Sequence, residues 1–352
     1  MATIAITETD STDLKPIVSF GLITDIHYAN QDDRWNYSKT FLRRYRNSLN
    51  LVDQACNYWL NGIHPISFII QLGDIIDGSC QTNETSTDDL KLILKQFRDF
   101  SPIYHIWGNH ELYNFTRNEL LNGPLCSFDT KNISPGHYGT LLVCPNLRII
   151  AIDTYELSLL GIDKNNENYI KAMNLLKEYN KNENVNDPTG LDGYQQRFIK
   201  LNGALTHKQL LWLKEELMKA KHLHEKVIIV ENIVTASVEQ EFSFCANLEY
   251  AGHIPIHPKA GDELALLWNY EDILDILWTV DNTVLAYIAG HSHEGAYFYD
   301  EKNIHHLTLH AIVECEPDTN AFATVHVYKE FLIIQGIGRI GTYRIDLSNR
   351  NE

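Results

Sequence analysis

The sequence predicts an α/β fold in which buried strands alternate with helices along the chain. Three observations lead to this prediction: short apolar runs of strand length, longer segments with helical spacing between them, and polar residues directly after several of the apolar runs. The chain has 352 residues, of which 44% are hydrophobic and 21% charged, so it has enough apolar material for a large core. We expect one domain over residues 16–347, preceded by a polar leader at 1–15.

The predicted elements follow one another in a regular order. The run IVSFGLIT at 17–24 is apolar and β-branched, which is typical of a strand buried on both faces. A helix is expected at 36–60 and another at 90–100, and a third begins at Thr206, where leucines recur at helical spacing. The remaining strands are expected at 67–72, 103–107, 148–153, 227–230, 284–290, 304–310, 322–328 and 331–337.

The middle of the chain interrupts this alternation. Residues from about 160 to 202 are polar and rich in asparagine, and DPTG within them is a turn signal. We interpret this segment as a cap-like insertion or long loop within the domain, without a core of its own.

The acidic balance of the chain limits its partners. Asp and Glu number 46 against 29 Lys and Arg, a formal net charge of −17, which disfavours nucleic acids and anionic membranes. The first residues lack the pattern of a secretory signal, and nowhere does an apolar run reach the length of a membrane span. The six cysteines form no CxxC pair, so a reducing, cytoplasmic location is expected.

Four short polar motifs share one position, the end of a predicted strand. In open α/β sheets the ligand crevice lies outside these carboxyl ends. The motifs are Asp25-Ile26-His27, Gly73-Asp74, Gly108-Asn109-His110-Glu111 and Gly290-His291-Ser292-His293.

The residue types in these motifs fit a centre of two metal ions. Imidazole and carboxylate ligands suit Mn, Fe and Zn, and a carboxylate between two ions can bridge them. Asp25 and His27 are two residues apart, so on a strand they would point to the same face and share one metal. Asp74 is the natural bridge, because it is the lone carboxylate at its strand end. Two divalent ions would also supply about +4 locally and so attract a phosphate despite the acidic chain.

These motifs, in this order, resemble those of the calcineurin-like metallophosphoesterases. The resemblance implies a sandwich of two β-sheets flanked by helices, with a dimetal site at the carboxyl ends of the strands. It implies Asp25, His27, Asp74 and His293 as ligands of the first metal. The second metal would be bound by Asp74, Asn109, His291 and a further histidine.

We expect that further histidine to be His253. Families of this kind place it directly after a strand and often before a proline, and GHIPIHP has this context, with His257 as the nearest competitor. However, 21 residues (231–251) separate the strand at 227–230 from GHIPIHP. Either they loop out and the strand end re-forms beside His253, or they are a sequence artefact or an isoform, the reading that we favour.

Longer blocks resemble the manganese-dependent ADP-ribose/CDP-alcohol diphosphatases. They are IIQLGDIIDG, GNHELYNF, GHIPIHP, LLWNYEDIL, GHSHEGAY and DTNAFATVHVY. The resemblance implies hydrolysis of the pyrophosphate linkage in ADP-ribose and in CDP-alcohols such as CDP-choline and CDP-glycerol, by a metal-bound hydroxide. Manganese is the implied ion, with zinc or iron as alternatives.

Further residues are expected to act on a small nucleotide substrate. His110, next to Asn109, would contact the phosphate and protonate the leaving oxygen, or else only orient a ligand. Candidate substrate-binding residues are Trp35, Tyr113, Asn114 and Asn202. A monomer is favoured.

Two alternatives remain open at this point. One is a cyclic-nucleotide or other phosphodiesterase of the same superfamily. The other is a non-catalytic scaffold with this fold, whose mark would be the loss of metal ligands.

Overall fold

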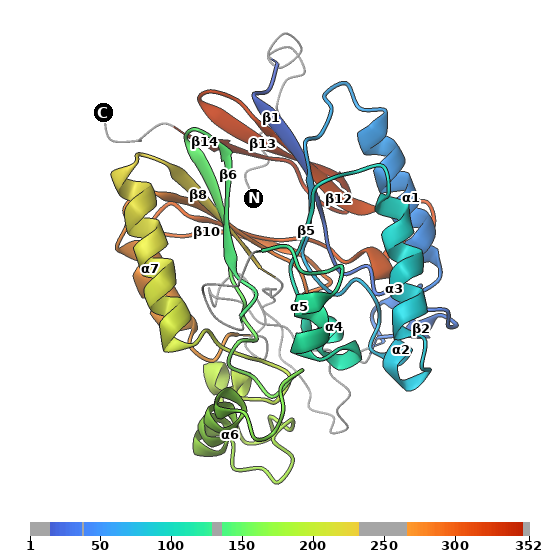
Figure 1. The fold of residues 1–352 in the computed structure, drawn as a ribbon, viewed down its shortest axis with the longest axis vertical. Coiled ribbons are helices and arrows are strands. Elements are labelled where there is room, and N and C mark those ends of the chain that lie inside the picture. Colours follow the sequence, from blue (N-terminus) through green and yellow to red (C-terminus); the bar gives the residue numbers. More distant parts are fainter. Residues whose placement is uncertain (1–14, 37–38, 129–135, 232–265, 348–352) are drawn as a thin grey trace.

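The computed structural model describes residues 15–36, 39–128, 136–231 and 266–347, and its centre is a sandwich of two six-stranded sheets (Figure 1). One continuous apolar core contains side chains from both sheets and from the helices that flank them. The expected two-sheet architecture is therefore confirmed.

The first sheet has the strand order β14-β13-β12-β1-β4-β5. Its parallel half consists of β1 (Val18–Ile23), β4 (Ile69–Gln71) and β5 (Ile103–His105). Its antiparallel half consists of β12 (Ala321–Val327), β13 (Phe331–Gly338) and β14 (Tyr343–Asp346). The carboxyl ends of β1, β4 and β5 consequently lie at one edge of the sandwich.

The second sheet has the strand order β10-β11-β9-β8-β7-β6. Four neighbouring strands are parallel: β11 (His305–Thr308), β9 (Val284–Ala289), β8 (Lys226–Glu231) and β7 (Leu147–Ala151). The edge strands β10 (Ala296–Tyr299) and β6 (Gly139–Cys144) are antiparallel to their neighbours. All six residues of β9 are buried, which explains its continuous apolar sequence.

Helices cover both outer faces of the sandwich (Figure 1). Helices α1 (Asn47–Leu60) and α3 (Ser86–Leu94) lie beside the first sheet, and α7 (His207–His222) lies beside the second, next to α8 (Tyr270–Trp278). Trp59 fixes α1 to the sheet: its indole N–H donates to the Thr324 hydroxyl at 3.0 Å, and its ring fills the space where Gly21 lacks a side chain.

Short elements complete the chain between the sheets and helices. They are β2 (Arg34–Trp35), β3 (Leu42–Arg43), α2 (Ser79–Thr82), α4 (Asn109–Asn114), α5 (Arg117–Asn122), α6 (Glu167–Tyr179) and the 3₁₀ turns Lys95–Phe97, Gly193–Arg197 and Ile312–Glu314 (η5). Within the described ranges, no helix combines the length and apolar character needed to cross a bilayer.

The structure corrects the sequence-based elements in several places. The helix expected at 36–60 begins only at Asn47, because Trp35 and Leu42 pair across the β2–β3 ribbon. The cap-like segment contains a helix, α6, which projects from one end of the molecule (Figure 1). A small apolar cluster there is separate from the main core and consists of Leu159, Ala172, Leu176, Phe198, Ala204 and Trp268. The domain boundaries stay a prediction.

Candidate metal centre

The four polar motifs come together at one edge of the sandwich. Asp25 and His27 follow β1, Asp74 follows β4, Asn109 and His110 open α4 after β5, and His291 and His293 follow β9. All seven residues are buried, with at most 6% of any of them exposed. The carboxyl ends of parallel strands from both sheets thus place these side chains in one cluster.

The backbone at the strand ends adopts conformations that most residues avoid. Asp25, His27, Asp74 and His291 have φ angles of 49°, 43°, 53° and 78°, in the left-handed region. Such angles are uncommon outside glycine and persist only where the surrounding structure holds them. The sharp turns at β1, β4 and β9 therefore aim these side chains into the cluster.

One group of side chains gathers around His27. Its Nε2 atom lies 3.1 Å from His293 Nε2, 3.6 Å from Asp25 Oδ1 and 3.7 Å from Asp74 Oδ2. Asp25, His27 and His293 each offer a ligand atom within 4.8 Å of the others. A single cation could contact this whole group.

A second group gathers on the other side of Asp74. His291 Nδ1 lies 2.9 Å from Asp74 Oδ2, and Asp25, Asp74 and His291 again offer ligand atoms within 4.8 Å of one another. Asp74 lies between His291 and the group around His27, since its Oδ2 atom is also 3.7 Å from His27 Nε2. This is the placement expected of a bridging carboxylate.

The donor chemistry of the cluster fits divalent cations. Asp25 Oδ1 and Asn109 Oδ1 are buried oxygens that accept no hydrogen bond from the described residues. Burial disfavours a charge on His27, but the combined attraction of Asp25, Asp77 and Asp74 outweighs it and raises the pKa of His27 to about 10. The cluster therefore stabilises positive charge, and buried anionic oxygens with imidazole nitrogens are typical ligands of Mn, Fe and Zn.

Glu111 fastens two of the motif loops to each other. Its carboxylate accepts hydrogen bonds from the backbone N–H groups of Asp74 at 2.8 Å, Ile75 at 2.7 Å and Gly108 at 2.7 Å. Glu111 thus fixes the loop after β4 against the start of α4. The sequence contained this residue in GNHE, but only the fold shows its role.

His110 lies beside Asp77 with its ring edge-on to that of His27, 4.3 Å between centroids, and it forms a third candidate ligand group with His27 and Asp74. Its Nδ1 atom accepts a hydrogen bond from the Gly78 N–H at 2.8 Å, so the neutral ring carries its proton on Nε2. Burial, together with the nearby His27, lowers the pKa of His110 to about 4. Asp77 Oδ2 lies 3.5 Å from the Nδ1 atoms of both His27 and His110, and of these two only His27 Nδ1 can carry a proton toward it.

Glu314 was not anticipated from the sequence. Its carboxylate contacts His293 Nδ1 at 2.6 Å, although it lies 21 residues further along the chain in η5. No spacing signal links these two residues, because β10 and β11 separate them. Only the three-dimensional arrangement identifies the pair.

The predicted substrate-binding residues differ in their surroundings. Tyr113 accepts a hydrogen bond from Asn109 Nδ2 at 3.0 Å, and Asn114 donates to the carbonyls of Asp77 and His110. Asn202 is buried and donates to the Arg197 carbonyl, whereas Trp35 on β2 is 60% exposed. His253 and residues 232–251 lie outside the described residues.

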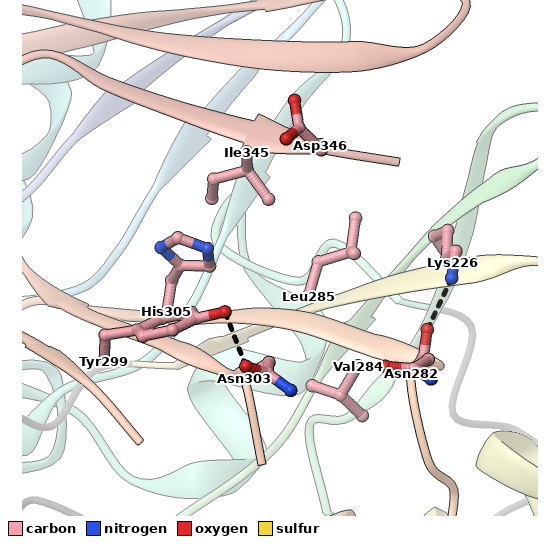
Figure 2. A pocket seen from close by; sticks show the side chains of 9 residues that line it. All are labelled: Lys226, Asn282, Val284, Leu285, Tyr299, Asn303, His305, Ile345 and Asp346. Carbon is pink, nitrogen blue, oxygen red and sulfur yellow. Dashed lines mark hydrogen bonds between the residues drawn. The ribbon is translucent and has the colours of Figure 1, made fainter. Parts of the chain in front are cut away.

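A separate pocket lies away from the cluster. Figure 2 shows its lining side chains, among them Lys226, Tyr299, His305 and Asp346. Lys226, Val284 and His305 stand at the beginnings of β8, β9 and β11. The pocket is therefore at the opposite end of these parallel strands from His291 and His293.

Comparison with known proteins places the chain in a family. A sequence model described as calcineurin-like phosphoesterase matches residues 18–295. Curated proteins named manganese-dependent ADP-ribose/CDP-alcohol diphosphatase are 37% identical in Xenopus tropicalis (93% of each chain) and 34% identical in Homo sapiens (92% of this chain, 91% of the relative).

A relative of known structure has the same fold. The crystal structure of a dimetal phosphatase from Danio rerio superposes with a TM-score of 0.85 at 32% identity and covers 95% of this chain and all of the other. The match of sequence and fold over nearly the whole chain shows that this protein belongs to the calcineurin-like phosphoesterase family, in the group of the manganese-dependent ADP-ribose/CDP-alcohol diphosphatases.

Proposed function

We propose that the protein hydrolyses the pyrophosphate linkage of nucleoside diphosphate compounds, such as ADP-ribose and the CDP-alcohols CDP-choline and CDP-glycerol. Water is added across the phosphoanhydride, so ADP-ribose gives AMP and ribose 5-phosphate, and CDP-choline gives CMP and phosphocholine. The observation that carries the proposal is the overlap of two candidate ligand groups, Asp25-His27-His293 and Asp25-Asp74-His291, with Asp74 Oδ2 also 3.7 Å from His27 Nε2. The names of the relatives support the substrate class.

The ligands divide between two cations, of which manganese is the one that the relatives' names support. Asp25, His27, Asp74 and His293 would hold the first ion, and Asp74, Asn109 and His291 the second. His253 is proposed as the last ligand of the second ion on its sequence context alone. Zinc or iron would also suit this donor set.

The charge at this edge favours a pyrophosphate. Two bound divalent cations neutralise charge on phosphate oxygens and lower the pKa of a water molecule. Among the proposed ligands only Asp25 and Asp74 carry formal negative charge, so about +4 from the ions exceeds the −2 of the ligands. A small anionic nucleotide can therefore bind a protein whose net charge is −17.

His110 is proposed to act directly on the substrate. With Nδ1 engaged by the Gly78 N–H, its Nε2–H group is left to donate to a phosphate oxygen or to the leaving oxygen. The Gly78 N–H holds the ring in this orientation. Tyr113 acts indirectly, because its hydroxyl fixes the amide of Asn109 and leaves Asn109 Oδ1 for the metal.

The nucleoside end of the substrate requires an aromatic face. Trp35 is exposed on the β2–β3 ribbon, and Arg43 of the same ribbon contacts Glu314 behind His293. We propose that Trp35 stacks on the base, while Asn114 supports the backbone of Asp77 and His110 and Asn202 that of Arg197 through bonds to their carbonyl groups. A cytoplasmic monomer without nucleic-acid or membrane partners is the proposed state.

A substrate panel tests the function. Purified protein with a fixed concentration of manganese is given ADP-ribose, CDP-choline, CDP-glycerol and cyclic AMP, and the nucleoside monophosphate released is measured. We expect hydrolysis of the pyrophosphates and little of cyclic AMP. Preferential hydrolysis of cyclic AMP would instead indicate a phosphodiesterase, and inactivity toward all four with no bound metal would indicate a scaffold.

A further inference from the structure

Glu314 lies directly behind His293, on the side away from the metal ligands. Its Oε1 atom is 2.6 Å from His293 Nδ1, and the side chains are only 1% and 5% exposed. A carboxylate accepts hydrogen bonds, so the contact places the proton of His293 on Nδ1. The lone pair of Nε2 then points toward the group that contains His27 Nε2 at 3.1 Å and Asp25 Oδ1 at 3.9 Å.

Glu314 is itself held by an arginine that is mostly covered by the protein. Arg43 of β3 donates from Nε to the same Oε1 atom at 3.2 Å, and its side chain is 14% exposed. Without Arg43, the Glu314 carboxylate would stay buried but lose its positively charged hydrogen-bond donor. Arg43, Glu314 and His293 therefore form one chain of polar contacts from the β2–β3 ribbon to the cluster.

Backbone hydrogen bonds run beside these side chains. The Arg44 N–H donates to the Val313 carbonyl at 2.7 Å, and the Val313 N–H donates to the Asp25 carbonyl at 3.2 Å. The Ala311 N–H donates to the His293 carbonyl at 3.1 Å. The turn η5 is thus fixed between the ribbon and two of the proposed metal ligands.

We propose that Glu314 and Arg43 are positioning residues for the first metal, and that they couple the ribbon carrying Trp35 to this metal through His293. The proposal rests on the proposed function, because it assumes that His293 binds a cation. A carboxylate behind a metal-binding imidazole fixes its tautomer and orientation and makes it a stronger ligand. Trp35 pairs with Leu42, the neighbour of Arg43. The contact between Arg43 and Glu314 therefore holds both the ribbon that carries Trp35 and the imidazole of His293.

Metal affinity in the absence of substrate tests the proposal. Metal-free protein is titrated with manganese, and free ion is followed by electron paramagnetic resonance. For Glu314→Gln we expect affinity for one of two ions to fall by about 10- to 100-fold, the range for such partners of ligating histidines. Arg43→Gln should lower the affinity for the same ion by a smaller factor. In both variants excess manganese should restore most of the turnover.

A matched control lies two residues away. Glu316 pairs with Arg44 much as Glu314 pairs with Arg43, but it is 61% exposed and is not among the contacts of His293. Glu316→Gln should therefore bind manganese like the wild type. If Glu316→Gln loses affinity as strongly as Glu314→Gln, a general effect of breaking ion pairs replaces the positioning role.

Two outcomes would overturn the inference. One is a folded Glu314→Gln protein, with wild-type near-ultraviolet circular dichroism, that binds both manganese ions with unchanged affinity. If Glu314→Gln does not fold, Glu314→Asp keeps the charge beside Arg43 but shortens the reach to His293, and unchanged binding there would be equally decisive. Because binding is measured directly, a wild-type protein that binds manganese but cleaves no nucleotide would contradict the proposed function alone.

Discussion

At the scale of single residues, the metal centre depends on side chains held at strained strand ends. Asp25, His27, Asp74 and His291 all have positive φ, and Glu111 uses its carboxylate to hold three backbone N–H groups around them. The polar residue types could be read from the sequence because each follows an apolar run. Asp77 and Glu314 could not be assigned roles in this way, since their partners are identified only by the fold.

Substitution of His110 distinguishes a catalytic role of this residue from a structural one. We expect His110→Ala to lower turnover by about 10²- to 10⁴-fold, because the residue would donate a proton or hydrogen bond in the reaction. The manganese content should stay near normal, since its Nδ1 contacts Gly78 and Asp77 rather than a proposed ligand atom. Turnover and bound metal are measured on the same preparation. Loss of metal together with activity would make His110 a structural residue instead.

Glu231 gives the protein a pH dependence of stability. It is buried at the end of β8 beside Thr154 and Tyr287, and burial raises its pKa well above the ordinary value. The folded state therefore retains a proton that the unfolded chain releases above about pH 4.3. The contribution of Glu231 to stability is therefore fully present below that pH and declines as pH rises toward the folded pKa, by about 1.4 kcal/mol per unit.

The variant Glu231→Gln should remove this decline. Relative to the wild type, the free energy of unfolding of this variant should increase more at pH 8 than at pH 5, as measured by urea denaturation at each pH. The exposed Glu301→Gln serves as the control and should change neither value by more than about 0.5 kcal/mol. An equal gain for Glu231→Gln at both pH values would show that titration of Glu231 is not the cause.

At the scale of elements, the close approach of β9 to β1 shapes the metal centre. A Cβ atom on Gly290 would lie 1.9 Å from Thr24 Oγ1 and 3.0 Å from Asp25 Oδ2. Thr24 donates to this same Asp25 oxygen at 2.7 Å, so any shift of the threonine moves a proposed ligand. The glycine before His291 is therefore required by the distance between the two strand ends.

We expect Gly290→Ala to lose manganese affinity and at least about 100-fold in turnover, because small displacements of reacting groups are costly. Isothermal titration with manganese and a turnover assay measure the two effects. Gly62→Ala is the control, since its nearest contact would be an ordinary 3.4 Å from a backbone oxygen. Wild-type affinity in Gly290→Ala would mean that the two strand ends separate without disturbing Asp25.

The elements that the sequence predicted best are those buried on both faces. The strands β1, β4 and β9 lie within the expected ranges, and β8 and β12 differ from theirs by one residue at each end, because these runs are mostly apolar. The edge strand β6 alternates irregularly between buried and exposed residues, and its pattern gave no such signal. Helix α6 is polar over most of its surface, so it was expected as loop.

At the scale of the whole molecule, two sheets bring together residues that are far apart in the chain. The first sheet supplies Asp25, His27, Asp74 and Asn109, and the second supplies His291 and His293. The sandwich therefore has to form before either metal site is complete. The sequence predicted this assembly only through the order of its motifs and their resemblance to a family, not through any local pattern.

The most direct test of the account is a stepwise manganese titration of metal-free protein with ADP-ribose as substrate. Bound metal per chain and release of AMP are followed together, in the wild type and in Asp74→Asn, which alters the proposed bridge. We predict that the metal-free protein is inactive, that activity develops as the second equivalent binds, and that Asp74→Asn loses both metal and activity. Full hydrolysis by metal-free protein, or wild-type activity in Asp74→Asn, would contradict the dinuclear mechanism.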